Sequence, residues 1–550
     1  MTPYDLISAI ASAVRRAVET GAFVADVPSD IVVERPKNPE HGDYATNVAM
    51  RLAKTAGKPP RIVAEAIAKV LTDTDGIASV DVAGPGFLNI TLDSGSLGEL
   101  AKSIVEQGPE YGRSSVLAGK KVNLEFISAN PTGPLHLGHT RWAAVGDAIG
   151  RVLTAAGAEV TREFYINDRG LQMDLFGASL QAAALGRPIP ENGYHGEYIA
   201  ELAKQVLSEH PEIGDQTGQQ QLESFREVGY QLQLAQQKQT LEDFGTHFDV
   251  WYSERFLHTS GAVERGLDKL KKQGHTFTAD GALWLRTTDF GDDKDRVLLR
   301  SNGELTYFAS DTAYYVDKRN RGFDLCIYLL GADHHGYVDR LKTVAQCAGD
   351  DPRQTLQILI GQLVKIVKAG EEVRLSKRAG DIVTLTDFVE AAGLDAVRYS
   401  LSRYPVDSPL TLDLDVITRA GNENPVYYVQ YAHARTCNVI KNAADVGIEL
   451  GVFKPELLSH ATEANLLTAL GDFGRVVAQA AELREPHRIA RYLESLAGEF
   501  HRWYDACRVA PRGDEEITDA HRTRLWLAVA TRVVLANGLQ MLGVSAPERM

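Results

Sequence analysis

The chain has 550 residues, with 58 lysine and arginine side chains against 73 aspartate and glutamate, and carries a formal net charge of −15. This length predicts about three or four domains. The acidic balance disfavours binding of nucleic acid through overall charge, so an RNA partner would need local basic patches. The four cysteines form no C-x-x-C pair, which excludes a disulfide framework and a zinc ribbon. No apolar run of membrane-spanning length and no signal peptide is visible, so we expect a cytoplasmic protein without membrane contact.

Residues 1–112 form the first predicted domain, an α+β unit. Apolar side chains recur at helical spacing near its start, at Leu6, Ile10, Val14 and Val18. A Gly-Pro-Gly turn at residues 84–86 then enters a strand. Tyr44 lies in a polar stretch with no recognised catalytic arrangement around it, which favours a structural role or an RNA contact.

The stretch LEFISANPTGPLHLGHTR, residues 124–141, predicts a strand, a tight turn and the start of a helix. Side chains alternate with period two before the turn, and apolar residues recur at helical spacing from Trp142 to Ala156 after it. Such a turn places backbone N–H groups at the positive end of a helix, where nucleotide phosphates bind.

Two histidines stand where this turn meets the helix. Gly133 and Gly138 are spaced as in the common phosphate loop, but His139 follows where that loop needs a lysine, so a different class of nucleotide site is indicated. His136 and His139 can donate hydrogen bonds to phosphate oxygens as negative charge builds in a transition state. The pattern fits the H-x-G-H motif of class I aminoacyl-tRNA synthetases and related nucleotidyl transferases. A chance match in a histidine-containing turn is the alternative.

Alternating strands and helices over residues 113–403 predict a Rossmann-like, doubly wound parallel sheet. An insertion is expected near residues 185–300, with helices around 197–209 and 218–246. The glutamine-rich part of this insertion, residues 216–238, is interpreted as the solvated face of a helix.

An apolar strand at residues 325–330 ends in a polar run that contains Gly331, Asp333 and His334. Histidine beside aspartate suggests a metal, but no third ligand accompanies the pair at a defined spacing. A nucleotide or substrate contact at the edge of the sheet is therefore favoured.

A basic loop at residues 370–380 completes the nucleotide hypothesis. Three basic side chains within five residues can converge on a polyphosphate. The loop resembles the K-M-S-K signature of class I synthetases, with Arg374 at its first position and Ser376 and Lys377 retained. The resemblance implies that the Lys377 ammonium faces the β- and γ-phosphates of ATP. A basic surface loop without function is the alternative.

Six segments together resemble bacterial-type arginyl-tRNA synthetases over essentially the whole chain. They are EFISANPTGPLHLGHTR, YINDRG, GADHHGYVDRLK, VRLSKR, NPVYYVQYAHAR and NGLQMLGVSAPERM. The resemblance implies an N-terminal domain that touches the tRNA elbow, the catalytic domain, and an all-α helical anticodon-binding domain at residues 404–550. Some arginyl enzymes with a poorly preserved second signature carry a lysine just before H-x-G-H. This sequence has Thr-Gly-Pro there and retains Lys377.

The C-terminal sequence agrees with a helical domain. Asn424 and Pro425 supply an N-cap and a first-turn proline for a helix. Apolar stripes at residues 489–507 and 525–542 predict further helices with buried faces. RNA contacts would come from exposed partners through phosphate pairing and base stacking. The candidates, with Tyr44 in the N-terminal domain, are Tyr431, Arg435, Arg502 and Arg508.

A guanidinium presents a fork of donors and favours carboxylates or amide oxygens in a largely desolvated pocket. By resemblance, the substrate-pocket positions are Glu125, Asn130, Tyr307 and Asp311. We assign Asp311 and Glu125 to the guanidinium or ammonium charges. Asn130 would make an orienting polar contact, and Tyr307 would supply a hydroxyl and a ring wall. The alternative for Asp311 is that it only caps the helix that follows.

The resemblance implies ATP-dependent attachment of L-arginine to tRNA(Arg) through an arginyl-adenylate, with release of AMP and pyrophosphate. It further implies that arginine activation requires bound tRNA. ATP with Mg²⁺ is expected, without a structural metal held by the protein, and the absence of coiled-coil heptads favours a monomer. The expected catalytic residues are His136, His139 and Lys377, and the expected ATP contacts are Gly138, Gly331, Asp333, His334, Arg374 and Ser376.

Two alternatives stay open from the sequence. Another class I synthetase would share both signatures. A cysteine enzyme should show zinc-ligand cysteines, which are absent here. A glutamate enzyme should have cationic side chains in its substrate pocket rather than the carboxylates of Glu125 and Asp311. A non-catalytic RNA-binding paralogue would tend to lose His136, His139 and Lys377, and all three are present.

Overall fold

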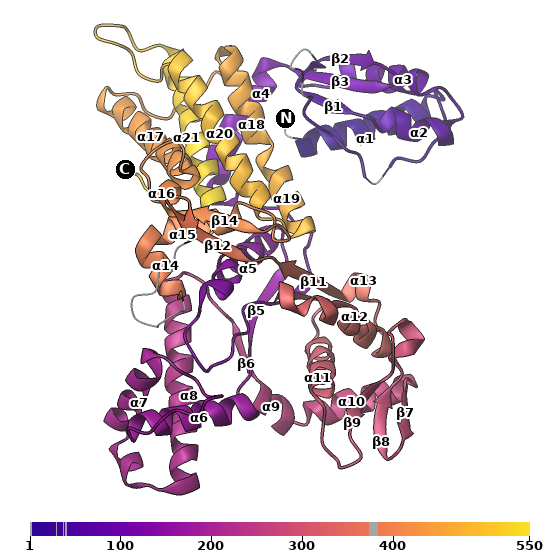
Figure 1. The fold of residues 1–550 in the computed structure, drawn as a ribbon. Helices are drawn as coiled ribbons and strands as arrows, with labels where there is room; N and C mark the ends of the chain where they lie inside the picture. Colours follow the sequence, from indigo (N-terminus) through magenta and orange to yellow (C-terminus); the bar gives the residue numbers. More distant parts are fainter. Residues whose placement is uncertain (1–2, 29, 37, 39–40, 373–382) are drawn as a thin grey trace.

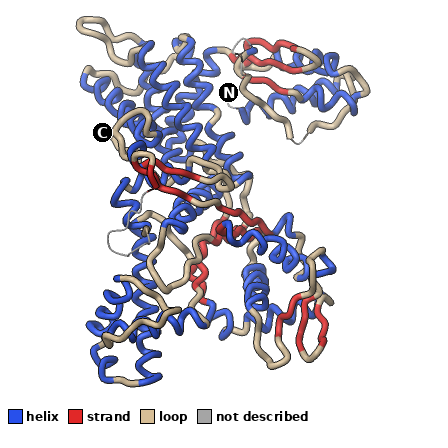
Figure 2. The backbone as a smooth tube through the Cα atoms, viewed as in Figure 1, coloured by secondary structure: helices blue, strands red, loops and turns tan. Residues whose placement is uncertain are grey.

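The computed structural model describes residues 3–28, 30–36, 38, 41–372 and 383–550. The chain forms an N-terminal α+β unit, a central parallel sheet with inserted segments, and a helical C-terminal layer (Figures 1 and 2). This arrangement confirms the predicted fold class. Over the described ranges, none of the helices is both long and apolar enough to cross a bilayer.

The N-terminal unit is built on a small antiparallel sheet of strand order β1-β3-β2. The side chains of Leu6, Ile10 and Val14 are fully buried, as their helical spacing predicts. Helices α2 and α3 pack on the sheet and α1 packs on α3. The elements are α1 (Pro3–Glu19), β1 (Tyr44–Thr46), α2 (Val48–Ala56), α3 (Pro60–Thr72), β2 (Ile77–Ala83) and β3 (Phe87–Leu92).

The central sheet has five parallel strands in the order β11-β10-β4-β5-β6. The chain leaves β4 toward β5 and β6 on one side and returns on the other side as β10 and β11. The strand order therefore reverses between β4 and β10, and ligands of open α/β sheets bind at the carboxyl ends of the strands at such a point. The strands are β4 (Lys121–Glu125), β5 (Glu159–Ile166), β6 (Val250–Ser253), β10 (Leu325–Gly331) and β11 (Leu356–Gly361).

Helix α5 (Leu137–Ala155) follows β4 and covers one face of this sheet. It approaches closely because Gly146 has no side chain. A Cβ atom at Gly146 would lie 2.4 Å from the ring of Phe126, the residue after β4. The helix is therefore held directly behind the turn that its N-terminus forms with the strand.

The first inserted segment is helical and lies between β5 and β6, with α6 (Leu171–Ala184), α7 (Glu197–Glu209) and α8 (Gly218–Asp243). The two later helices confirm the predicted ones. The interpretation of the glutamine-rich stretch as a solvated face is wrong for one side of α8, because Gln221, Gln233 and Gln237 are buried. Their amides hydrogen-bond within the protein instead of facing water.

The segment after β6 carries short helices and a separate antiparallel sheet, β7-β8-β9 (Figure 1). Its elements are α9 (Glu254–Thr259), α10 (Ala262–Gln273), β7 (Thr276–Ala279), β8 (Ala282–Leu285) and β9 (Arg296–Leu299). The chain then returns to the central sheet through α11 (Tyr307–Asn320), and a 3₁₀ turn, η5 (Ala332–Tyr337), and α12 (Val338–Cys347) follow β10.

A third small sheet, β13-β12-β14, lies between the central sheet and the C-terminal helices (Figure 2). Its strands are β12 (Val364–Lys368), β13 (Glu371–Glu372) and β14 (Leu410–Asp413). The neighbouring helices are α13 (Pro352–Thr355), α14 (Leu385–Ala392), α15 (Leu394–Ser402) and α16 (Leu414–Ile417).

The C-terminal layer consists of helices α17 (Pro425–Asp445), α18 (Ala461–Gly471), α19 (Phe473–Leu483), α20 (His487–Ala506) and α21 (Asp519–Met541). An early helix, α4 (Ser94–Gln107), packs against α18 and α21 (Figure 1). Asn424 occupies the predicted N-cap position of α17, but its side chain makes no capping bond. Its amide donates instead to the carbonyls of Ile417 and Arg419, at 2.9 Å each.

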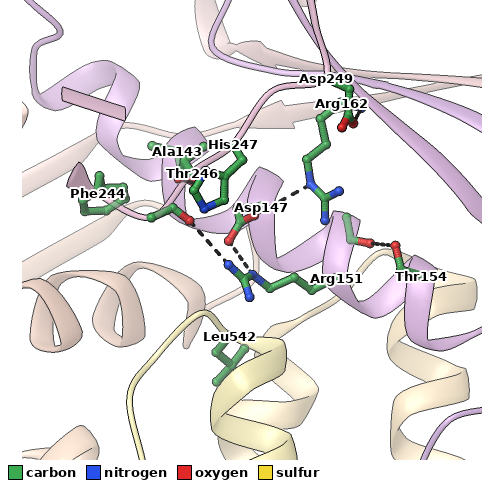
Figure 3. Close-up of polar contacts among 12 residues, drawn as sticks. Ala143, Asp147, Arg151, Thr154, Arg162, Phe244, Thr246, His247, Asp249 and Leu542 are labelled. Carbon is green, nitrogen blue, oxygen red and sulfur yellow. Dashed lines mark hydrogen bonds and ion pairs between the residues drawn. The ribbon is translucent and has the colours of Figure 1, made fainter. Parts of the chain in front are cut away.

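A buried ion pair within the central domain also contacts the helical layer. Arg398 of α15 donates to Asp147 of α5 at 2.5 Å and to the carbonyl of Leu542, just after α21, at 3.3 Å. The Asp147 carboxylate also accepts from Arg151 at 2.7 Å and lies 3.8 Å from Arg162 (Figure 3). Three arginines, Arg151, Arg162 and Arg398, therefore lie around the single carboxylate of Asp147.

Candidate active site

The backbone is strained where β4 ends. Ile127 and Ser128 have φ angles of 70° and 46°, in the left-handed region that non-glycine residues rarely adopt. The Ser128 hydroxyl donates to Glu125 at 3.0 Å and accepts from the backbone N–H of Tyr165 at 3.1 Å. Strain of this kind persists only where the surroundings hold it in place, and it is common at functional sites.

The two histidines form the N-terminal cap of α5. The Nδ1 atom of His136 accepts from the Gly138 N–H at 3.1 Å, and the Nδ1 atom of His139 accepts from the His136 N–H at 3.3 Å. Their ring centroids lie 3.9 Å apart. Since each Nδ1 accepts, the ring proton of each neutral imidazole sits on Nε2, which remains available as a donor.

Both imidazoles are held in the neutral form. Desolvation lowers the pKa of His136, and desolvation together with the neighbouring ring of His136 lowers the pKa of His139 to about 3. At neutral pH each ring is therefore a neutral N–H donor at a helix N-terminus, and that combination suits a phosphate oxygen.

Side chains of the first inserted segment brace the turn before the histidines. Gln237 of α8 donates to the carbonyls of Asn130 and Gly133, at 2.9 and 2.7 Å. Tyr198 of α7 donates to the carbonyl of Thr132 at 3.1 Å, and Asn167 donates to the Asn130 side chain at 3.0 Å. The predicted substrate residue Asn130 is thus fixed on both its backbone and its amide.

Glu125 carries a charge that is already balanced. The Nζ atom of Lys318 on α11 lies 2.5 Å from its carboxylate, and Lys318 is fully buried. The same ammonium lies over the rings of Tyr314 and Tyr328, at 4.5 and 3.8 Å from their centroids. Sequence reasoning missed Lys318, which lies 193 residues from Glu125 in the chain.

Asp311 lies inside α11 and does not cap it. The cap is Thr306, whose hydroxyl accepts from the Ala309 N–H at 3.2 Å, so the capping alternative for Asp311 is excluded. Burial raises the pKa of Asp311 to about 6, a hydrogen bond with Tyr337 lowers it and the charge of Glu125 raises it further. Tyr307, one turn earlier on the helix, is 81% exposed.

The charges of four carboxylates, that of Asp311 included, act on the half-buried hydroxyl of Tyr165 on β5. Burial raises the pKa of Tyr165, and the charges of Glu254, Asp311, Glu125 and Asp168 raise it further. Burial also raises the pKa of Glu254 to about 7. Sequence reasoning missed Glu254, because its position in a short helix after β6 carries no local motif.

Asp168 is the most firmly bound of these carboxylates. It accepts from the Ser253 hydroxyl at 2.6 Å, the Tyr230 hydroxyl at 3.1 Å and the Arg255 N–H at 3.0 Å. These three donors use most of the about four acceptor sites of the carboxylate. Asp311 and Glu254 are therefore the acidic groups most available to an added cation.

The predicted nucleotide residues of the GADHHG run lie at the carboxyl end of β10. Position 331 has no room for a side chain, since a Cβ atom there would lie 2.6 Å from the Asp333 carboxylate. The carboxylate of Asp333 lies 3.5 Å from the exposed ring of His334. No group of three or more His, Cys, Asp or Glu residues arranged to hold a metal occurs in the part of the chain that the structure describes.

The basic loop with Arg374, Ser376 and Lys377 lies outside the described residues. The residues that follow the basic loop, Val383 and Leu385, are joined to the histidine turn by backbone hydrogen bonds. The Leu137 N–H donates to the Val383 carbonyl at 2.8 Å, and the Leu385 N–H donates to the Leu135 carbonyl at 2.9 Å. The residue six positions after Lys377 is thereby bonded directly to the turn that carries His136.

Three family models match the chain. The arginyl-tRNA synthetase N-terminal domain matches residues 5–92, the class I (R) catalytic domain matches residues 101–400, and the DALR anticodon binding domain matches residues 429–550. The catalytic-domain match alone spans more than half of the 550 residues. The chain belongs to the arginyl-tRNA synthetase family. As a class I arginine–tRNA ligase it attaches arginine to tRNA(Arg), and it uses ATP as class I synthetases do.

Relatives of full length support this assignment to the arginyl-tRNA synthetases. The chain is 58% identical over 553 residues to an arginine–tRNA ligase of Renibacterium salmoninarum and 57% identical over 554 residues to one of Kineococcus radiotolerans, and each alignment covers 100% of both chains. Its fold is that of the Thermus thermophilus arginyl-tRNA synthetase, with a TM-score of 0.76, 24% identity and 100% coverage of both chains.

The helical domain of this arginyl-tRNA synthetase carries an aromatic and cationic surface on α17 and α20. Tyr427 and Tyr431 are stacked with centroids 6.0 Å apart, and Tyr431 is partly exposed. The Arg435 guanidinium lies 4.1 Å from the ring centroid of Tyr504. Exposed aromatic rings beside guanidinium groups suit stacking with unpaired bases.

The other predicted tRNA residues lie in different surroundings. Arg502 and Arg508 are exposed and pair with the half-buried Glu499 at 2.9 Å and the exposed Glu515 at 3.7 Å, respectively. Tyr44, in contrast, is 2% exposed within β1. The RNA contact predicted for it is therefore corrected to a role in the N-terminal core, where its ring is packed among apolar side chains.

Proposed function

We propose that the four-carboxylate region beside the histidine turn is the arginine pocket. Asp311 would accept the substrate guanidinium, and Glu254 would share that charge. Glu125, already balanced by Lys318, would orient the α-amino group through its remaining lone pairs, with Asn130 as a polar contact and Tyr307 as the outer wall. The observation that carries the proposal is that Glu125, Asp168, Glu254 and Asp311 all act electrostatically on one residue, Tyr165, near the carboxyl end of β5.

We propose further that activation takes place at the turn. An oxygen of the arginine carboxylate attacks the α-phosphorus of ATP, the bond to the bridging oxygen breaks, and pyrophosphate leaves. The Nε2–H groups of His136 and His139 would donate to phosphate oxygens as charge spreads over them. The backbone N–H groups at the start of α5, including that of Gly138, would add to this field.

Residues from two other segments would complete the ATP-binding site. Lys377, with Arg374 and Ser376, would reach the β- and γ-phosphates, and the attachment of Val383 and Leu385 to the histidine turn supports this assignment. Gly331, Asp333 and His334 at the carboxyl end of β10 would contact the adenosine part. Mg²⁺, when bound to ATP, neutralises phosphate charge, and we propose that phosphate oxygens rather than a protein cage hold it.

The second step transfers arginine to tRNA. The 2′-hydroxyl of the terminal ribose attacks the carbonyl of the mixed anhydride, and AMP leaves. We propose that Tyr431 and Arg435 stack on anticodon bases while Arg502 and Arg508 pair with phosphates. The N-terminal domain, residues 1–112, would touch the tRNA elbow, with the catalytic domain at 113–403 and the anticodon domain at 404–550. We propose a cytoplasmic monomer.

Aminoacylation tests this proposal. Purified protein with ATP, Mg²⁺ and total tRNA should charge arginine alone among the twenty amino acids, and charging of another amino acid would reject the pocket assignment. Arginine-dependent exchange of pyrophosphate into ATP should occur only when tRNA(Arg) is present. Equal exchange rates with and without tRNA would reject the proposed dependence on tRNA.

A further inference from the structure

A cavity of about 190 Å³ lies at the opposite end of α5 from the histidines. Arg151 and Thr154 line it from the last turns of α5, and Arg162 lines it from β5. Arg151 is twelve residues beyond His139, which places the cavity roughly 18 Å along the helix axis from the histidine turn. The cavity is therefore separate from the ATP site.

The remaining wall comes from two segments distant in sequence. Gln540 and Asn537 belong to α21, and Arg113 belongs to the connection before β4. Arg151 also donates to the carbonyl of Gln540 at 3.4 Å, so the cavity lies directly on the contact between the catalytic and helical domains. A ligand in this position would touch both domains at once.

The side chains that line the cavity include three arginines and no acidic residue, in a protein of net charge −15. The carboxylate of Asp147, outside the cavity, is bound by the buried Arg398 at 2.5 Å and by the lining residue Arg151 at 2.7 Å. It lies 3.8 Å from Arg162, too far for a hydrogen bond. Among the described residues, the buried Nε atom of Arg162 has no hydrogen-bond partner.

Other negative groups lie near the cavity but do not line it. Glu110 lies 3.5 Å from Arg113. Asp249 accepts from the backbone N–H of Arg162 and lies at the main-chain end of that side chain, away from its guanidinium (Figure 3). The C-terminal ends of α5 and α21 add about half a negative charge each. The side chains that line the cavity itself nevertheless carry three positive charges and no negative one.

We propose that this cavity binds a phosphate group, either as a free anion or as part of RNA. Guanidinium groups match the oxygens of a phosphate and bind them bidentately. Arg113, Arg151 and Arg162 come from three different segments, so a tetrahedral anion with several acceptor oxygens can satisfy all three. The bound anion relieves the repulsion among the arginines around Asp147 and strengthens the contact between α5 and α21.

Calorimetric titration of the full-length protein with inorganic phosphate, at constant ionic strength, tests the site. Arg113→Gln is the preferred variant because Arg113 has a side chain 44% exposed and only a weak ion pair, so its loss leaves the fold intact. Lys102→Gln is the matched control, since Lys102 on α4 is also 44% exposed, has a similarly weak ion pair with Glu106 and lies outside the cavity.

Arg113→Gln should weaken phosphate binding roughly tenfold, the usual effect of losing one charged hydrogen bond. Lys102→Gln should bind phosphate like the wild type. Equal affinities in the wild type and Arg113→Gln, an equal loss in Lys102→Gln, or no phosphate binding by the wild type would each overturn the proposal. This binding experiment does not depend on aminoacylation, so it can fail while the proposed enzymatic function stands.

The same titration with saturating tRNA(Arg) distinguishes the two sources of phosphate. If tRNA abolishes the binding that depends on Arg113, the site holds a phosphate of the tRNA backbone. If that binding persists at the same affinity, the site takes a free anion. Both results support a phosphate site in the cavity.

Discussion

Single ionisable groups set the expected pH dependence of arginine recognition. Burial raises the pKa of Asp311 to about 6 and that of Glu254 to about 7, whereas desolvation and His136 lower the pKa of His139 to about 3. A carboxyl group with a raised pKa loses its negative charge as the pH falls through that value. Asp311 and Glu254 of the proposed pocket therefore titrate close to neutral pH, and His139 does not.

From these values we predict the pH profile of kcat/KM for arginine. It should fall as the pH drops from about 7 to below 6, because Glu254 and then Asp311 become protonated and no longer attract the guanidinium. His139 should add no further change in this range, since it is neutral throughout. Steady-state aminoacylation with saturating ATP and tRNA checks the profile, and a flat profile between pH 8 and pH 5 would contradict it.

At the scale of elements, the buried pair of Glu125 and Lys318 ties β4 to α11. Lys318→Met should lower the free energy of unfolding by about 3–5 kcal/mol, because it leaves an unpaired carboxylate in the interior. The double variant Glu125→Gln/Lys318→Met should recover most of that loss, since the uncompensated charge is gone. Urea unfolding of the single and double variants measures both effects.

Activity separates the two roles of Glu125. If its carboxylate orients the arginine ammonium, the double variant stays poorly active even where its stability is restored. A double variant as unstable as Lys318→Met would contradict the role of the pair in stability. A double variant with wild-type kcat/KM for arginine would contradict the role of Glu125 in the pocket.

Elements with a local signal could be predicted from the sequence. Alternation before residue 126 and helical spacing after Trp142 predicted the strand–turn–helix unit that contains the histidines, and the structure has β4 and α5 there. H-x-G-H likewise identified His136 and His139, because cap geometry depends on neighbours within one turn.

Long-range pairings could not be predicted in the same way. Lys318 meets Glu125 only because β4 and β10 are adjacent in the sheet, and Glu254 joins the carboxylates only because β6 is next to β5. No local sequence pattern predicts that α4 packs against α18 and α21. The glutamine-rich composition predicts an exposed Gln237. Its burial depends on amide partners that lie more than a hundred positions away, in the turn.

At the scale of the whole molecule, Arg398 connects three parts of the chain. It binds Asp147 on α5, the carbonyl of Phe244 after α8 and the carbonyl of Leu542 after α21. Arg398→Met should cost about 3–5 kcal/mol by leaving Asp147 with less compensation in a buried site. Calorimetry should show that the helical domain unfolds at a lower temperature than in the wild type.

Arg300→Met is a control for this prediction, because the side chain of Arg300 is exposed and its ion pair with Glu304 lies on the surface. It should leave the unfolding profile unchanged. If Arg398→Met unfolds at the wild-type temperature, the junction does not depend on this ion pair.

The central claim is that this chain activates arginine in a carboxylate pocket beside the histidine turn, with Asp311 as the main guanidinium partner. Its most direct test is arginine-dependent pyrophosphate exchange, with tRNA(Arg) present, in the wild type, Asp311→Ala and the control Asp339→Ala, whose carboxylate is 94% exposed on α12. We expect Asp311→Ala to lose at least about two decades of exchange rate, as removal of one partner of a buried ion pair implies, and Asp339→Ala to match the wild type. Exchange at the wild-type rate by Asp311→Ala would contradict the account.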